Sequence, residues 1–218
     1  MKKDNAYRYI KGQIMEGKWN PDTAINVNEI ADELGMSRTP IHKALTQLGQ
    51  EGFLTIIPQV GVFVKLPDRN EVLERVTVCA NLDALMAEQA AKTLTEEDLD
   101  YLESTLVRMD DLSLSSEEYA TLNIEFHSTI YNASGFTYTL NLTRQLWDYL
   151  NYVGTPELLF IEDRRKRSQS EHWLIYYALK DRDSRLVKRL VELHMRRVSE
   201  VIDAKYHMMK SNQQQVLS

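Results

Sequence analysis

The sequence predicts a mainly α-helical protein in two parts, a small N-terminal domain that ends in a β-hairpin and a larger C-terminal antiparallel α-helical bundle. Three observations support this prediction. Apolar residues recur at helical spacing in three short segments before residue 52. Two β-branched runs, "FLTII" and "GVFVKL", then flank "PQV", as the strands of a hairpin flank its turn. From Glu71 onward no strand-like alternation appears, and Pro156 is the only proline.

The composition is that of a globular protein. The chain has 218 residues, of which 43% are hydrophobic and 27% charged, and this length can bury a core in one or two domains. The single cysteine, Cys79, cannot form an intrachain disulfide, and no secretory signal opens the chain, so we expect a cytoplasmic protein. No run approaches the roughly 18 apolar residues of a membrane span, and no membrane partner is expected.

The formal charge of −6 does not exclude nucleic acid as a partner, because the charge is unevenly distributed. Residues 1–66 carry 8 Lys+Arg and 7 Asp+Glu, a net +1, which leaves 18 against 25, a net −7, for residues 67–218. A DNA-binding domain needs positive charge only where it meets phosphate. The acidity therefore belongs to the second domain.

The first two segments of the N-terminal domain are predicted to be short amphipathic helices. The first, at 6–17, ends where "EGKWNPDTAI" supplies the Gly, Asn and Pro residues that stop a helix. The second ends at Gly35, where a left-handed residue is favoured. The apolar positions are Tyr7, Ile10 and Ile14 in the first helix and Val27, Ile30, Ala31 and Leu34 in the second.

A third helix follows, with Ser37 as its N-cap and Pro40 tolerated in its first turn. It should end near Gly49–Gly52, and its apolar stripe is Ile41, Ala44, Leu45 and Leu48. Two short helices joined by a tight turn and followed by a hairpin are typical of a winged helix-turn-helix domain. The polar stretch "KLPDRN" then marks a boundary, so we expect this domain at 1–66 and a linker at 67–70.

The second domain is predicted at 71–208, with about six helices packed as a bundle. Two helices have clear start signals: Thr95 precedes three acidic residues, and Ser115 or Ser116 precedes two. Such residues cap the helix and suit the positive end of its dipole. The tail at 209–218, which includes "KSNQQQVLS", has no apolar period, so it is expected to be flexible.

The polar face of the third helix predicts contact with DNA. Arg38 and His42 are four residues apart and share a face opposite the apolar stripe, with Thr39 and Lys43 beside them. An arginine in this position can bind guanine O6 and N7 in the major groove, while hydroxyl groups bind phosphates. The alternative is an ordinary capped surface helix, which the order of helices and hairpin disfavours.

Residues 1–66 resemble the winged-helix domain of the GntR family of bacterial transcription regulators, through "VNEIADELGMSRTPIHKALTQLGQEGFLTIIPQVGVFV". His42 stands where members usually carry a second arginine and Lys43 where they usually carry glutamate, so operator affinity or preference is expected to differ. The resemblance implies DNA contacts by Asn28, Arg38, Thr39 and His42, with Gln59 and Gly61 in the wing. Ser37 and Lys43, on the same helix as Arg38, complete the candidate set.

Three histidines of the second domain, His127, His172 and His194, lie within apolar helical stripes and should point into the bundle. Inward histidines from three helices can converge, and neutral imidazoles bind divalent transition metals. Asn123, one turn before His127, can add an amide oxygen. The stripe assigned to His127 contains Ile124, Ile130 and Tyr131. The alternatives are hydrogen-bonded core histidines and a metal-free pocket in which the histidines bind a ligand directly.

Residues 70–205 resemble the all-helical, FCD-type effector domain of FadR-like GntR regulators, through "NIEFH", "SEHWLIYYALKDRD" and "LVELHMRRV". Metal-binding members carry Asp-x-x-x-His on one helix and one histidine on each of two later helices. The resemblance therefore implies a metal site of Asn123, His127, His172 and His194, with Asn123 in place of the usual aspartate. Loss of that anionic ligand favours a softer metal such as zinc or nickel.

The same resemblance implies a small organic acid as effector, with a carboxylate that completes the coordination of the metal. The arginine that members use for such a ligand is replaced by Cys79, although Arg75 lies one turn earlier, and Tyr149 either lines the pocket or packs in the core. These changes permit a different, more apolar effector. The basic run Arg164–Arg167 is expected to be a solvated helix face, the commoner role of such a run, rather than a phosphate or DNA site.

Together these features predict a ligand-responsive transcription regulator, not an enzyme, with repression as the expected sign. A single winged helix offers few base contacts, so we expect a homodimer on an inverted-repeat operator in double-stranded DNA. Two alternatives stay open: a metal-independent regulator of a larger acyl-type ligand, and a metal-dependent hydrolase. The hydrolase is disfavoured because no carboxylate is evidently placed as a general base.

Overall fold

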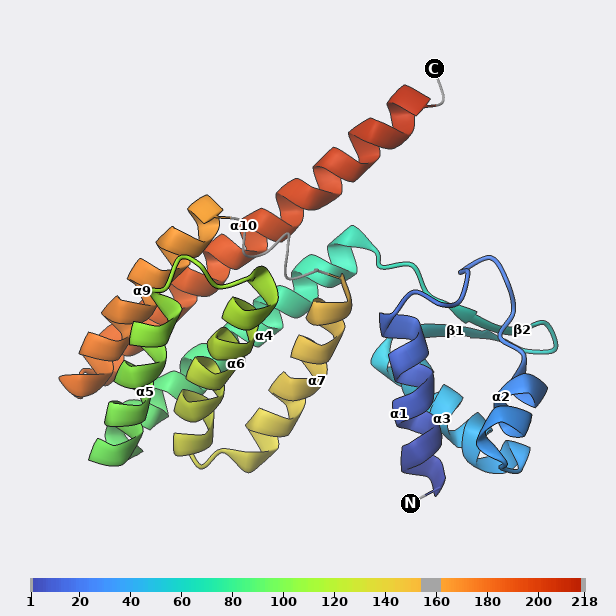
Figure 1. Cartoon of the computed structure of the whole chain (residues 1–218), viewed down its shortest axis with the longest axis horizontal. Coiled ribbons are helices and arrows are strands. Elements are labelled where there is room, and N and C mark those ends of the chain that lie inside the picture. Colours follow the sequence, from blue (N-terminus) through green and yellow to red (C-terminus); the bar gives the residue numbers. More distant parts are fainter. Residues whose placement is uncertain (1, 154–161, 217–218) are drawn as a thin grey trace. The chain divides into compact units, whose positions relative to one another are not determined.

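The computed structural model describes residues 2–153 and 162–216, shown as ribbons in Figure 1. The chain divides into two compact units, Met1–Asp68 and Arg69–Ser218, each with its own core. The described residues contain no helix that is long and apolar enough to cross a membrane.

The first unit is a three-helix domain with a two-stranded antiparallel sheet. Helices α1 and α3 pack against each other, and α2 packs on α3. Their apolar stripes form the core, in which Ile10, Ile41 and Leu48 are fully buried. The elements are α1 (Lys2–Met15), α2 (Val27–Leu34), α3 (Arg38–Glu51), β1 (Leu54–Ile57) and β2 (Gly61–Val64).

The turn between α2 and α3 has the predicted glycine, but the predicted side-chain cap at the start of α3 is not formed. Gly35 takes a left-handed conformation, φ 57°, and its N–H closes the end of α2. Asn26 caps the start of α2 by accepting a hydrogen bond from the Asn28 N–H. Ser37 occupies the N-cap position of α3 with extended backbone, but its side chain makes no capping hydrogen bond. The predicted capping by Ser37 is therefore wrong, and its hydroxyl is left at the surface.

Strands β1 and β2 form the predicted hairpin, with Leu54 opposite Val64 and Ile57 opposite Gly61. The Val60 N–H bonds the Ile57 carbonyl at 3.1 Å and closes the turn. Within that turn Gln59 has a φ of 62°, the left-handed region that side chains other than glycine rarely adopt.

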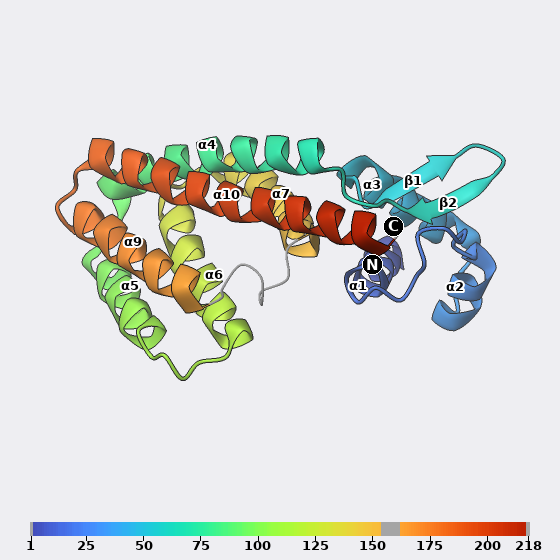
Figure 2. The same ribbon diagram turned by 90° about the horizontal axis from the view of Figure 1, so that it is seen from above.

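The second unit is a bundle whose described part is wholly helical (Figures 1 and 2). Helices α4 and α10 run side by side in opposite directions. Helix α6 packs against both α4 and α5, and α9 packs against α5 and α10. The described helices are α4 (Arg69–Thr93), α5 (Glu96–Met109), α6 (Ser116–Ala133), α7 (Thr137–Val153), α9 (Glu162–Lys180) and α10 (Ser184–Val216).

The helix starts predicted in the bundle are confirmed. Thr95 and Asp98 form a capping box at α5, and Ser115 and Glu118 form one at α6, so each pair satisfies two backbone N–H groups. The core that these helices enclose includes Leu102, Tyr119, Phe126 and Ile175.

The ends of the elements differ from the sequence expectation at three places. Helix α1 starts at Lys2 rather than near Ala6. Helix α4 starts at Arg69, within the expected linker 67–70. Helix α10 continues to Val216, so most of the expected tail 209–218 is helical backbone. A physical reason is shared by all three segments: none contains proline or glycine, and Lys, Arg and Gln are good helix formers.

Candidate DNA-binding surface and metal centre

Helix α3 has one buried and one exposed face, as predicted. Ile41, Leu45 and Leu48 are buried in the first unit. Arg38, Thr39, His42 and Lys43 are exposed on the other side, and Asn28 is exposed near the start of α2. Among the described residues no ion pair or hydrogen bond engages the side chain of Arg38, His42 or Lys43. These side chains are therefore available to a partner that approaches α3.

The two candidate wing residues differ in exposure and packing. Gln59 is fully at the surface, in the turn at the tip of the hairpin. Gly61 is half-buried at the start of β2, where a Cβ would lie 3.1 Å from the Ala24 Cβ. Gly61 therefore has a packing reason to be glycine that is independent of DNA.

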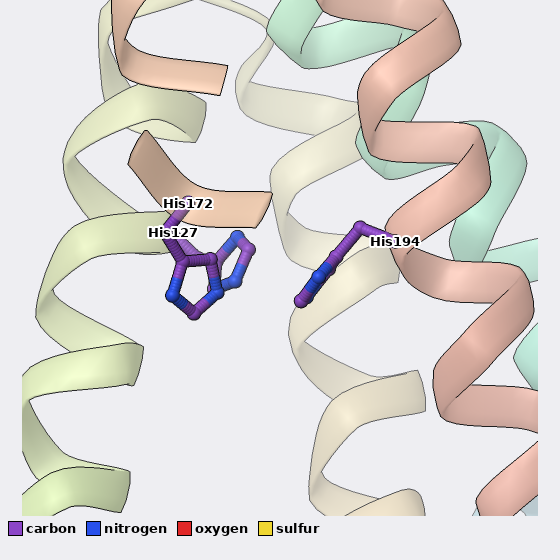
Figure 3. Close-up of side chains that lie close together, drawn as sticks. All are labelled: His127, His172 and His194. Atoms are coloured by element: carbon purple, nitrogen blue, oxygen red, sulfur yellow. The ribbon is translucent and has the colours of Figure 1, made fainter. Parts of the chain in front are cut away.

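The three candidate histidines converge inside the second unit (Figure 3). His127 on α6 is 8% exposed, His172 on α9 is 0% exposed and His194 on α10 is 3% exposed. Their ligand nitrogens all lie within 4.8 Å of one another. The His194 side chain extends from α10 toward the other two rings. Segments that are up to 67 residues apart in the chain thus supply one cluster.

The hydrogen bonds around this histidine cluster suit a divalent transition metal. In each ring Nδ1 faces a polar partner: the Tyr131 hydroxyl at 3.2 Å from His127, Gln169 Oε1 at 3.5 Å from His172, and Glu171 Oε2 at 2.7 Å from His194. Donation from Nδ1 to Gln169 and Glu171 leaves the Nε2 lone pairs free. His172 Nε2 is buried without a hydrogen-bond partner. Residues with outer partners and free inner nitrogens are what a metal site requires.

Asn123 is the candidate fourth ligand. It lies one turn before His127 on α6, and its Oδ1 atom is buried without a hydrogen-bond partner. Glu125 cannot take its place, because it interacts with Arg108 at 3.5 Å on the outside of the bundle. The stripe assigned to His127 needs one correction, since Ile124 is 55% exposed. Phe126 packs on the histidines instead, with ring centroids 5.4 Å from His127 and 5.0 Å from His172.

Burial keeps the imidazoles neutral. It lowers the pKa of His127 to about 3, and repulsion from His194 adds to the effect. Burial also lowers the pKa of His172 well below its ordinary value. For His194, burial lowers the pKa while the hydrogen bond to Glu171 partly opposes the shift. Neutral imidazole is the form that binds metal, so no proton has to be removed at neutral pH.

The candidate effector residues Arg75, Cys79 and Tyr149 lie along α4 and α7. The Arg75 guanidinium stacks 3.9 Å from the centroid of the buried Tyr149 ring and bonds Glu71 Oε1 at 2.9 Å. Cys79 is buried one turn later, with its Sγ 3.7 Å from Asp83 Oδ2. The structure thus brings Arg75 and Tyr149 together and places Cys79 next to a buried acid.

Asp83 is a buried carboxyl group that the sequence reading did not assign to the site. It is 0% exposed, and Trp147 Nε1 donates to its Oδ2 at 3.2 Å. Burial raises its pKa to about 7, although hydrogen bonds to the carboxylate offset part of that rise. The Tyr131 hydroxyl interacts with both Asp83 and His127, which links Asp83 to the histidine cluster. The sequence feature that could have identified Asp83 is its position four residues after Cys79 on an alanine-rich helical face.

The basic run at the start of α9 is not a solvated face, so that expectation is wrong for two of its four residues. Arg165 is buried and donates to the Leu114 carbonyl at 2.8 Å and to the Asp111 carbonyl. The Arg164 side chain is only 9% exposed, whereas that of Arg167 is 62% exposed. The helical period explains the split, because positions 164, 165, 168 and 169 face the bundle together.

Comparisons with known proteins match both units. Residues 2–64 match the family described as bacterial regulatory proteins, gntR family, and residues 74–197 match the FCD domain. An uncharacterized HTH-type transcriptional regulator of Streptomyces ambofaciens is 27% identical over 91% of this chain and 84% of its own. The transcriptional repressor GlaR of Escherichia coli K12 is 22% identical over 88% and 91%.

A solved structure of Escherichia coli McbR/YncC has the same fold, with a TM-score of 0.72 at 20% identity over 94% of this chain and 99% of that chain. The gntR family is described as bacterial regulatory proteins, and the two relatives are described as a transcriptional regulator and a transcriptional repressor.

Proposed function

Because the chain belongs to the GntR family of bacterial transcription regulators and carries an FCD effector domain, we propose that it is a ligand-responsive repressor that acts as a homodimer. Residues 1–66 bind DNA, and residues 71–208 bind the effector and dimerise. One observation carries the proposal: an exposed polar face on α3 and a buried three-histidine cluster occur in the same chain.

In this proposal α3 enters the major groove of the operator. Arg38 binds a guanine edge and His42 contacts a neighbouring base or phosphate. Ser37, Thr39, Lys43 and Asn28 bind the phosphate backbone, and Gln59 and Gly61 bring the hairpin tip to the duplex. The absence of intramolecular partners for Arg38, His42 and Lys43 in the described part of the chain supports this assignment. The free hydroxyl of Ser37 supports it too.

Dimerisation doubles the number of base contacts and requires an inverted-repeat operator in double-stranded DNA, with half-sites one or more helical turns apart. Repression follows if the operator overlaps a promoter, and effector binding then relieves it. The GlaR relative is described as a repressor.

In the second unit, His127, His172, His194 and Asn123 would hold a divalent metal, zinc or nickel by the neutral nitrogen-rich donor set. A bound ion would supply a positive centre to which a carboxylate can coordinate. The effector is accordingly a small organic acid, and Arg75, Cys79 and Tyr149 border the region that it enters from α4 and α7.

The response to effector uses the helices that carry the ligands. His194 lies on α10, which packs along α4, and α4 begins directly after the DNA-binding unit at Arg69. An effector that binds two arrangements of these helices unequally changes their populations and thereby the spacing of the two α3 helices. Equal binding to both arrangements would produce no regulation.

The experiment that tests DNA recognition is a footprint and gel-shift titration on the native promoter region. Arg38→Ala should weaken operator binding by about 1–3 kcal/mol and relax the preference at one base position. Lys43→Ala is the matched control: it should weaken binding to all sequences alike and reduce the salt dependence by about one counterion. If the unmodified protein shows no sequence preference, the proposed function is wrong.

Metal content separates the proposal from its alternative. Protein purified without an affinity tag or chelator should contain about one zinc or nickel ion per chain. A metal-free protein that binds its operator and releases it with a larger acyl-type ligand would instead identify a metal-independent regulator.

A further inference from the structure

We propose that Arg164, in the first turn of α9, is the anion-binding residue of the effector site and takes the carboxylate group of a small organic acid. The proposal rests on the proposed function, because it specifies how the second unit recognises its effector. It assigns a direct ligand contact to a residue of the basic run at 164–167.

Arg164 is a half-buried cation whose Nη1 atom has unused hydrogen-bonding capacity. Its side chain is 9% exposed, and its Nη1 atom is buried without a hydrogen-bond partner. Among the described residues, the acid that forms an ion pair with Arg164 is Glu171. Arg164 Nη1 and Glu171 Oε2 are 3.6 Å apart, which is too far for a good N–H···O hydrogen bond. Since arginine stays protonated at neutral pH, an incoming anion would find the N–H groups of Nη1 available.

Glu171 is shared between Arg164 and other groups, because each of its two oxygens also accepts a hydrogen bond elsewhere. Oε2 accepts from His194 Nδ1 at 2.7 Å, and Oε1 accepts from Arg197. Arg167 also lies 3.7 Å from Oε1. One carboxylate thus faces three guanidinium groups, and the surroundings of Glu171 carry a net positive charge.

Arg164 lies beside the histidine cluster. Its Nη1 atom lies 3.6 Å from Glu171 Oε2, the same oxygen that lies 2.7 Å from His194 Nδ1. The candidate metal ligands are three neutral imidazoles and one neutral amide, so they add no negative charge. A divalent ion there would make the excess positive charge larger, and a bound carboxylate would offset it.

Arg75, the arginine among the candidate effector residues, differs in this respect. Arg75 donates to Glu71 Oε1 from Nε at 3.2 Å and from Nη2 at 2.9 Å, and it stacks on Tyr149. Its charge is therefore already paired. Arg164 presents the planar, forked donor set that matches a carboxylate in a bidentate arrangement.

The test compares the full-length unmodified protein with Arg164→Gln and Arg167→Gln. Arg167 is the matched control, because it is on the same helix at a similar distance from Glu171, 3.7 Å against 3.6 Å, but is mostly exposed. Acetate, succinate and inorganic phosphate serve as probes. The midpoint of thermal unfolding and the calorimetric Kd are measured for each probe, with chloride at matched ionic strength as the reference. Metal content and operator binding without any probe are measured on the same samples.

A carboxylate probe should stabilise the unmodified protein and Arg167→Gln, while Arg164→Gln should bind it at least about tenfold more weakly. Arg164→Lys should recover part of the affinity, because it keeps the charge without the fork. The control variant Arg167→Gln should keep its metal and its operator binding. Should Arg164→Gln fail to fold, Arg164→Lys carries the comparison, and unchanged affinity in that variant overturns the proposal.

Two results would overturn the proposal directly: carboxylates that bind all variants equally or not at all, or an Arg164-dependent shift with phosphate alone. Failure of the proposed function is seen separately, as loss of sequence-specific DNA binding by the unmodified protein.

Discussion

The two units of this protein treat polar side chains in opposite ways. On α3 the side chains of Arg38, His42 and Lys43 are exposed and have no partner in the described part of the chain, which costs nothing because water bonds to them. In the bundle the polar groups are buried and most have specific partners. The few buried atoms without a partner, among them His172 Nε2, Asn123 Oδ1 and Arg164 Nη1, are therefore informative. A buried atom without a partner calls for an explanation such as a bound ion, ligand or water, whereas an exposed one indicates only a surface.

The largest expected effect comes from comparing alanine substitutions of two histidines, one in each unit. His172→Ala should abolish stoichiometric metal binding, with a loss of more than about 100-fold in affinity, beyond that of outer-shell substitutions, while operator binding persists. His42→Ala should do the reverse, retaining the metal and weakening operator binding by about 1 kcal/mol. Elemental analysis and gel-shift titration on both variants measure the two effects.

His172→Phe tests whether metal is lost only because His172→Ala leaves a cavity in the core. Phenylalanine keeps a ring there but removes the nitrogen ligands. A His172→Phe protein that still holds one metal ion per chain would show that the three histidines do not form the site.

The next effect concerns the pH dependence of stability in the bundle. The pKa of Asp83 is raised to about 7 in the folded protein, from an ordinary value of 3.8. The folded state thus binds this proton more tightly than the unfolded state. The contribution of protonated Asp83 to the free energy of unfolding is therefore fully present below about pH 4 and is lost as pH rises through 7. As the pH rises from 5 to 8, the stability of Asp83→Asn relative to the unmodified protein should increase by about 2–3 kcal/mol.

Denaturant unfolding at several pH values measures this difference. Trp147 supplies a second readout, because its indole N–H donates to Asp83 and its fluorescence should titrate near pH 7. Trp147→Phe should remove that signal. A stability difference that does not vary with pH would contradict the assignment.

The smallest effect separates two serines at N-cap positions. Ser115 caps α6 in a capping box, whereas Ser37 occupies the same position on α3 without a capping bond. Ser115→Ala should cost about 1 kcal/mol of stability and leave DNA binding unchanged. Ser37→Ala should leave stability nearly unchanged and weaken operator binding. Thermal unfolding and gel-shift titration check the pair, and an equal loss of stability in both variants would contradict the difference in capping.

Much of the fold was predictable because its signals are local. The apolar stripe of α3, the left-handed Gly35, the hairpin and the caps at Thr95 and Ser115 each depend on residues within a few positions of one another. Capping by Ser37 was not predictable, because the same residue in the same position either bonds the backbone or points to solvent. The ends of α1, α4 and α10 were misplaced, since helix formers without proline or glycine give no clear stop.

The candidate site divides in the same way. The inward direction of His127, His172 and His194 followed from their stripes, and the structure shows that the three rings meet. Their partners Tyr131, Gln169 and Glu171 and the burial of Arg164 did not follow from the sequence. Each depends on how far one helix is rotated and shifted against another.

By itself, the sequence determined the kind and order of the elements, the exposed polar face of α3 and the set of histidines that point inward, because helical periodicity and turn chemistry are properties of neighbouring residues. Only the tertiary structure decided which buried atoms are left without a partner, and that Arg164 rather than Arg167 lies in the bundle. Those outcomes depend on packing between helices that are distant in the chain, where burial removes water as the default hydrogen-bond partner.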